Sequence, residues 1–191
     1  MDAVTHNRKL ALLNQPHMQP LLAYRDKLIE RTNRKIPHFD PEDGGTRAEL
    51  LLLLSHVDGD PGSERSGSAF ISVENDDQTA RNLHRVIDHL GLSRETLLIW
   101  NVVPWQDGHP AKQAELGAIH LPRLVQALPQ LRGIAVLSRE GQILKAVQDE
   151  LAHVHGLEWK LTSSPAPRAY NQHGGQLTLD LQTLARRLSL I

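Results

Sequence analysis

The sequence predicts an α/β protein, a three-layer αβα sandwich in which helices cover both faces of a four-stranded parallel sheet. Two observations lead to this fold class. Four short runs are apolar along nearly their whole length, which is typical of strands buried on both faces. These runs alternate with longer stretches of helical periodicity, as expected for helical crossovers between parallel strands. The expected strands are 49–55, 97–105, 133–137 and 157–162.

The run 97–105 is the most informative of the four. It is too short for a comfortable helix and contains Pro104, so we interpret it as a strand. Asn101 is a polar interruption near its carboxyl end. A buried amide without a hydrogen bond costs on the order of a few kcal/mol. The side chain of Asn101 therefore either bonds to nearby backbone or recognises a ligand, and the residues alone leave both readings open.

Helices are expected before, between and after the strands. The clearest is 79–90, where four apolar side chains share one face, Asp76 and Asp77 are plausible caps and Gly91 ends the pattern. Residues 1–20 contain two prolines among polar residues, and we expect them to be irregular or only loosely helical. The other expected helices are 21–33, 112–128, which Pro122 disturbs, 142–153 and 177–190.

Composition limits the class of protein. The 191 residues are enough for one domain, 1–191, with a substantial core. The absence of cysteine excludes disulfides, thiol catalysis and a cysteine-ligated iron–sulfur cluster. The eleven histidines are scattered, so we expect no metal site. No apolar run approaches the roughly 20 residues that span a bilayer, and the amino terminus lacks a signal-peptide pattern, so we expect a soluble, cytoplasmic protein without a membrane partner.

The net charge and the absence of common motifs narrow the possible functions only slightly further. The formal net charge of −1 provides no global basic field that would by itself indicate nucleic acid. The sequence lacks a phosphate-binding glycine-rich loop ending in Lys-Ser or Lys-Thr, a Gly-x-Gly-x-x-Gly after a strand and a Gly-x-Ser-x-Gly elbow. Nucleoside triphosphates, dinucleotides and serine hydrolysis are therefore disfavoured.

Polar side chains follow each of the four expected strands. This matters because ligands of parallel α/β sheets bind beyond the carboxyl ends of the strands. A large apolar residue, Phe70, also lies in the long loop 56–77, and loops of that length are usually functional or disordered. The polar residues near the strand ends are Ser55, His56 and Asp58; Asn101; Ser138, Arg139 and Glu140; and Ser163, Ser164 and Arg168.

Four stretches resemble the uracil-DNA glycosylase superfamily, and more narrowly a bacterial branch without an iron–sulfur cluster. The similarity covers about residues 36–172, most of the chain. The second and third stretches are long and fairly specific, whereas the last departs from the family pattern Ser-Pro-His-Pro-Ser-Pro. The stretches are FDPEDGG at 39–45, FISVENDDQTARNL at 70–83, WNVVPW at 100–105 and SSPAP at 163–167.

The resemblance implies a chemistry as well as a fold. Such enzymes extrude a base from the DNA duplex and cut its N-glycosidic bond, and the extrusion costs about a few kcal/mol. By position, Phe70 resembles the aromatic residue that stacks on the flipped base. Asn101 resembles the amide that reads the pyrimidine edge, donating to a carbonyl and accepting from the ring N–H. The alternative is that Phe70 fills the core under its loop and Asn101 bonds to backbone.

Two departures from the family pattern concern catalysis. The residue that handles water falls on Ser55 or His56, with Asp58 close by, and His56 has an unperturbed pKa near 6.5 that suits a general base. An ordinary polar loop is the alternative there. Ser164 stands where the family has a histidine that stabilises the departing base. A serine hydroxyl can donate a hydrogen bond but carries no positive charge, and losing such a contact typically costs about 10²–10³-fold in rate.

The loop 165–168 completes the expected site. We expect Arg168 to contact a DNA phosphate and Tyr170 to act as a wedge, with a solvated turn as the alternative. The sequence thus predicts a monomeric DNA repair glycosylase-like protein that binds DNA, flips uracil or a related deaminated base and hydrolyses its N-glycosidic bond without metal or organic cofactor. Two alternatives stay open: a catalytically silent superfamily member that binds DNA or a nucleobase, and an enzyme acting on free nucleosides.

Overall fold

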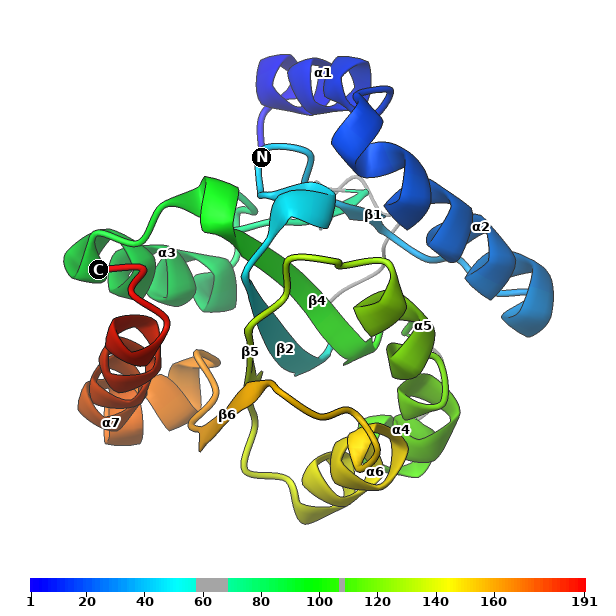
Figure 1. The fold of residues 1–191 in the computed structure, drawn as a ribbon. Helices are drawn as coiled ribbons and strands as arrows, with labels where there is room; N and C mark the ends of the chain where they lie inside the picture. Colours follow the sequence, from blue (N-terminus) through cyan, green and yellow to red (C-terminus); the bar gives the residue numbers. More distant parts are fainter. Residues whose placement is uncertain (58–68, 107–108) are drawn as a thin grey trace.

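The computed structural model describes residues 1–57, 69–106 and 109–191. A parallel sheet with the strand order β4-β2-β5-β6 forms its centre (Figure 1). The strands β4 and β5 are buried along their whole length, and β2 is almost entirely buried, whereas β6 is the more exposed edge strand. The strands are β2 Leu50–His56, β4 Leu97–Val103, β5 Gly133–Leu137 and β6 Glu158–Thr162.

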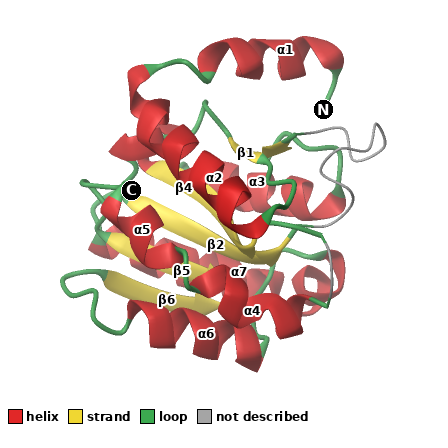
Figure 2. Cartoon of the chain, turned by 90° about the vertical axis from the view of Figure 1, so that its right-hand side faces the viewer, coloured by secondary structure: helices red, strands yellow, loops and turns green. Residues whose placement is uncertain are grey.

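Helices cover both faces of this sheet (Figures 1 and 2). The helices α3 and α7 pack together on one face, while α4, α5 and α6 cover the other face and α2 lies beside α5. No helix of the described ranges is long and apolar enough to cross a membrane. The helices are α2 Gln19–Thr32, α3 Gln78–Leu90, α4 Pro110–Ala118, α5 Leu121–Gln126, α6 Gly141–Leu151 and α7 Pro167–Arg187.

The predicted α/β fold class with a four-stranded parallel sheet between helices is confirmed. The local signals also act as expected: the Asp77 side chain accepts a hydrogen bond from the Ala80 N–H at 2.8 Å, and Gly91 ends α3 with φ 66°. The expected helix around Pro122 is divided into α4 and α5, with Pro122 in the first turn of α5. Helix α7 begins at Pro167, whereas the expected helix began at residue 177. The first turns were not predicted because they are polar and carry no apolar periodicity.

The expectation of an irregular amino-terminal segment is wrong. Ala3–Leu12 forms helix α1, and the 3₁₀ turn η1, Pro16–Met18, follows it. The Asp2 side chain caps α1 by accepting a hydrogen bond from the Thr5 N–H at 2.7 Å. The buried residue of α1 is Lys9, whose ammonium group is paired with carboxylates. Hydrophobic periodicity cannot detect a helix that an ion cluster holds in place.

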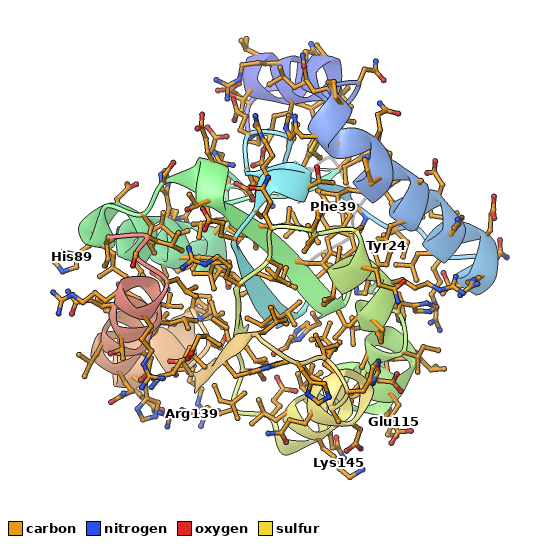
Figure 3. The ribbon with its side chains drawn as sticks, viewed as in Figure 1. Tyr24, Phe39, His89, Glu115, Arg139 and Lys145 are labelled. Carbon is orange, nitrogen blue, oxygen red and sulfur yellow. The ribbon has the colours of Figure 1, made fainter. Side chains whose placement is uncertain are left out.

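A second, two-stranded parallel sheet lies in segments expected to be loops. It pairs β1, His38–Phe39, with β3, Phe70–Ile71, so that His38 lies opposite Phe70. The Phe39 ring stacks on Trp100 of β4 with centroids 3.8 Å apart, and Tyr24 of α2 contacts both rings. Figure 3 labels Phe39 and Tyr24. The small sheet is thereby fixed to the large one. The remaining 3₁₀ turns are η2 Gly45–Arg47 and η3 Arg94–Thr96.

Candidate functional site

A small pocket lies where β2 and β4 end, between the β3 segment and the start of α3. Its volume is about 70 Å³, well below the roughly 300–1,000 Å³ of pockets that hold drug-sized ligands. Phe70 and Asn101 both line it, as does His56 from the end of β2. A ligand of this pocket must therefore be small. The lining also includes Leu54, Val57, Ile71, Ser72, Val73, Asn75, Asp77, Thr79, Ala80, Leu83 and Ile99.

Two amide oxygens in this pocket have no hydrogen-bond partner in the described part of the chain. Asn101 lies opposite Leu54 in the β2–β4 pairing and is only 3 % exposed, and its Oδ1 has no partner among the described residues. Asn75 donates through Nδ2 to the Phe70 carbonyl at 3.0 Å, and its own buried Oδ1 also has no partner within the described ranges. An unsatisfied buried acceptor costs about 1–3 kcal/mol. A ligand that donates N–H groups would remove this cost.

Phe70 is held in place by the β1–β3 pairing and by neighbouring imidazoles. Its ring lies 5.6 Å from that of His6 of α1, in an edge-to-face arrangement, and 5.5 Å from that of His38. Burial, reinforced by the charge of Arg25, lowers the pKa of His38 to about 4, so this imidazole is neutral at pH 7. The ring is 2 % exposed and still lines the pocket. Phe70 thus also belongs to the buried core, as the alternative reading of this residue expects.

A larger groove adjoins the pocket on the side of β5 and α7. Its volume is about 410 Å³, and it shares Leu54, His56 and Thr79 with the pocket, so the two hollows adjoin one another. His56 lies at the junction. The groove is also lined by Ser55, Arg139, Glu140, Ser163, Ser164, Ala166, Arg168, Ala169, Gln172 and His173.

The three candidates at and after the end of β2, Ser55, His56 and Asp58, have different positions. Ser55 is buried, and its hydroxyl donates to Ser138 Oγ at 2.9 Å, so it supports the junction between β2 and β5. Ser138 Oγ also accepts from the N–H of Glu140 at 3.2 Å. His56 lines both hollows and is the candidate placed to handle water. Asp58 lies outside the described residues.

The loop after β6 brings two serines to the groove. Ser164 accepts a hydrogen bond from the Ala166 N–H at 3.1 Å through its Oγ, which shapes the turn before α7. Ser163 is fully buried, lines the groove, and its Oγ has no partner in the described part of the chain. Sequence reasoning singled out Ser164 and assigned no role to Ser163, because the pattern of the loop does not show which hydroxyl is left without a partner.

The two expected DNA contacts do not lie together. Arg168 lines the groove, together with Arg139, which sequence reasoning did not assign a role (Figure 3). Tyr170 instead lines a separate hollow between α3 and α7 with Arg85 and Val86, and packs partly buried against the core. The structure therefore places two guanidinium groups, and not the tyrosine ring, at the groove.

Asn82 connects the two sides of the site. Its Nδ2 donates to the Pro165 carbonyl at 2.8 Å, and its Oδ1 accepts from Gln78 Nε2 at 2.8 Å. This buried amide ties α3 to the loop that carries the two serines. Asn82 belongs to the stretch 70–83 that carried the resemblance, but its contact with a loop 83 residues away is visible only in three dimensions.

The carboxylates with a spacing suited to a metal lie elsewhere. Asp40, Glu42 and Glu74 form such a group among the described residues. The Lys9 ammonium occupies their centre, at 2.7 Å from Asp40, 2.5 Å from Glu42 and 2.5 Å from Glu74. The arrangement is an ion cluster with its own internal cation.

The fold and the hollow define a parallel α/β protein with a ligand pocket at the carboxyl ends of its strands. The small pocket lies at the ends of β2 and β4, and the adjoining groove lies at the ends of β2 and β5, the point where the chain reverses direction across the sheet: β2 connects to β4 on one side, and β4 connects back across β2 to β5. This is the position at which such folds bind ligands. A scan of protein-family models and a search of curated proteins each find no match to this chain.

Proposed function

We propose that this protein is a DNA repair glycosylase-like protein that flips uracil or a related deaminated base into the small pocket and hydrolyses its N-glycosidic bond. One observation carries the proposal: Phe70 and Asn101, which lie in different stretches resembling uracil-DNA glycosylases, line one small pocket in which the amide oxygen is buried and has no partner among the described residues. The alternative, in which the amide only bonds to backbone, does not account for that oxygen.

The pocket fits a flat ring with both donors and acceptors. The Asn101 Oδ1 would accept the ring N–H of a pyrimidine, and its Nδ2 would donate to the adjacent carbonyl, while Phe70 would supply the stacking surface. A site that hydrogen-bonds a substrate in this way can reject a mismatched edge by about 10⁴-fold or more. The volume of about 70 Å³ favours a single ring over a purine.

His56 is the group best positioned to activate water. In the proposed reaction His56 accepts a proton as water oxygen bonds to C1′ of the sugar. The bond between C1′ and the base nitrogen breaks, and its electron pair leaves with the base. The products are an abasic site and the free base, which takes up a proton. Because His56 lies at the junction of pocket and groove, it faces the side on which the sugar of a bound base would lie.

The departing base receives weaker support than in the family pattern. Ser163 and Ser164 supply hydroxyl groups at the groove and no positive charge. We therefore expect slow excision, by about 10²–10³-fold relative to a site with a cation there. Arg139 and Arg168 provide the charge at the groove, where they would contact phosphates flanking the flipped nucleotide.

A catalytically silent base-binding protein is the second candidate. Two observations favour it: Ser55 donates its O–H to Ser138 Oγ, and Ser164 Oγ accepts from the Ala166 N–H, so both hydroxyls already take part in the local structure. Neither hydroxyl bond would prevent Phe70 and Asn101 from holding a base. The two candidates thus share the pocket and differ in whether His56 can activate water.

One assay separates these functions. The protein is incubated with duplexes that contain uracil, hypoxanthine or xanthine, and alkali then cleaves any abasic sites. We expect strand cleavage with uracil, and its loss in Asn101→Ala because the base loses its hydrogen-bonding partner. Asn14→Ala is the matched control, since Asn14 is exposed in the turn after α1. An active Asn101→Ala variant would exclude the assignment of Asn101.

The outcomes without cleavage are also informative. No cleavage of any substrate, with salt-dependent DNA binding retained, would favour the silent base-binding protein. If in addition no DNA binding is found, an enzyme acting on free nucleosides becomes the better account. Binding of free uracil, measured by calorimetry on the wild type and Asn101→Ala, tests the pocket independently of DNA.

A further inference from the structure

A second groove lies between α2 and α5, which run side by side on the face of the molecule shown in Figure 2. Its volume is about 540 Å³, within the usual range for ligand pockets. Tyr24 lines it and contacts Trp100, the residue that precedes Asn101 in β4. Since successive side chains of a strand point to opposite faces, this groove lies across the sheet from the pocket of Asn101.

Three cationic side chains line this groove. Lys27 and Arg31 are four residues apart on α2 and so share a helix face, and Arg123 approaches from α5. No carboxylate is among the lining residues, and none of the three cations forms an ion pair with a residue of the described ranges. Like charges at this helical spacing repel, so the groove carries a concentrated positive charge although the whole chain has a formal charge of −1.

Neutral hydrogen-bonding groups lie between the cations. His120 is 8 % exposed, and its pKa is lowered by burial and by the charges of Arg31 and Arg123. The Tyr24 hydroxyl accepts a hydrogen bond from Trp100, which leaves its own O–H to donate, and burial raises its pKa. The Gln126 amide completes the set. Such groups can bind the oxygens of an anion without adding a negative charge of their own.

We propose that the groove between α2 and α5 binds a phosphate group, with Lys27, Arg31 and Arg123 as the charged ligands and Tyr24 as a neutral donor. Guanidinium groups match the oxygens of a phosphate in bidentate geometry, and lysine serves as a point charge. A bound phosphate would offset the mutual repulsion of the three cations. Pro20, Ala23 and Ala127 provide an apolar wall against which the rest of a phosphate-bearing molecule would lie.

Calorimetric titration of the full chain with inorganic phosphate tests this site. We expect one saturable site that weakens with added salt, and a loss of at least about tenfold in affinity in the double variant Arg31→Gln/Arg123→Gln. Both side chains are exposed, so the variant keeps the core intact, which circular dichroism checks. Arg186→Gln, an exposed arginine on α7, is the matched control and should bind phosphate like the wild type.

A second titration, with an undamaged DNA duplex, identifies the source of the phosphate. A parallel loss of duplex affinity in the double variant would show that the groove holds a nucleic-acid backbone, whereas unchanged duplex affinity would identify a free phosphate ester. Asn101→Ala should leave phosphate binding unchanged, which keeps this site distinguishable from the base pocket. No saturable binding of inorganic phosphate, or equal affinity in the double variant, would overturn the proposal.

Discussion

Two clusters of buried polar side chains use their hydrogen-bonding capacity in opposite ways. Around Lys9, charged groups from α1, the segment after β1 and η3 are almost all paired: Lys9 bonds three carboxylates, and Arg94 bonds Asp40 and Asp43. In the pocket and groove at the strand ends, oxygens of Asn75, Asn101 and Ser163 are buried without a partner in the described chain.

This difference in hydrogen bonding distinguishes residues that maintain the fold from residues that we expect to bind a ligand. The cluster around Lys9 satisfies itself and needs no ligand, so its contribution is to hold α1 against the rest of the protein. The unpartnered oxygens reduce stability by themselves, and they are accounted for if a ligand supplies the missing donors. Substitutions should therefore affect stability at the first cluster and binding at the second.

The largest effect is expected for Lys9→Met. The substitution keeps the length of the side chain but leaves Asp40, Glu42 and Glu74 facing one another without their shared cation. Removing one partner of a buried ion cluster typically costs about 3–5 kcal/mol, and we expect the free energy of unfolding to fall by that amount. Urea titration followed by circular dichroism measures it. Lys145→Met, which breaks an exposed pair with Asp149, should leave the midpoint nearly unchanged. A stable Lys9→Met variant would mean that the cluster does not anchor α1.

A pair of buried asparagines offers a sharper comparison. Asn82 uses both ends of its amide, whereas the Asn101 oxygen has no partner within the described ranges. Asn82→Leu should lower the free energy of unfolding by about 1–3 kcal/mol, because the Pro165 carbonyl loses its donor. Asn101→Leu should lower it less or raise it by about 1 kcal/mol, since an unsatisfied acceptor is removed, while binding of uracil is lost. Equal destabilisation by both substitutions would show that Asn101 is a structural amide.

The sheet could be predicted because its strands are apolar throughout. Five consecutive leucines and the run around Trp100 leave no position for a polar face, and capping residues such as Asp77 and Gly91 mark the ends of α3. Helix α1 could not be predicted in the same way, because Lys9 is its buried anchor and a lysine is ordinarily read as a surface residue. The two-residue strands β1 and β3 are too short for any periodicity to show.

The candidate site was only partly accessible from the sequence. Phe70 and Asn101 were singled out as unusual residues and given roles by resemblance, and the structure brings them to one pocket. The commitment of Ser55 to Ser138 joins residues 83 positions apart and follows from the register of β2 and β5. The register of the strands decides which hydroxyl forms a hydrogen bond and which stays without a partner in the described chain. An apolar run such as 133–137 does not reveal that register.

The last comparison concerns the pH dependence of stability at Asp43. Burial and the neighbouring Asp40 raise the pKa of this carboxyl to about 7, against the opposing charge of Arg94, and its Oδ2 has no partner among the described groups. The folded state therefore binds a proton that the unfolded state, with a pKa of 3.8, releases, and the contribution of Asp43 to stability is lost as pH rises from about 4 to about 7.

Asp43→Asn, which cannot titrate, isolates this contribution. The folded-state pKa of His38 is about 4, below its ordinary value of 6.5, so His38 acts in the opposite direction: stability falls as pH falls from about 6.5 to about 4. The pH dependence of the wild type combines the effects of Asp43 and His38. Both proteins contain His38, so its effect cancels when one free energy of unfolding is subtracted from the other. The unfolding free energy of Asp43→Asn minus that of the wild type should rise between about pH 4 and about pH 7 and then level off. A flat difference would mean that Arg94 keeps Asp43 ionised throughout this pH range.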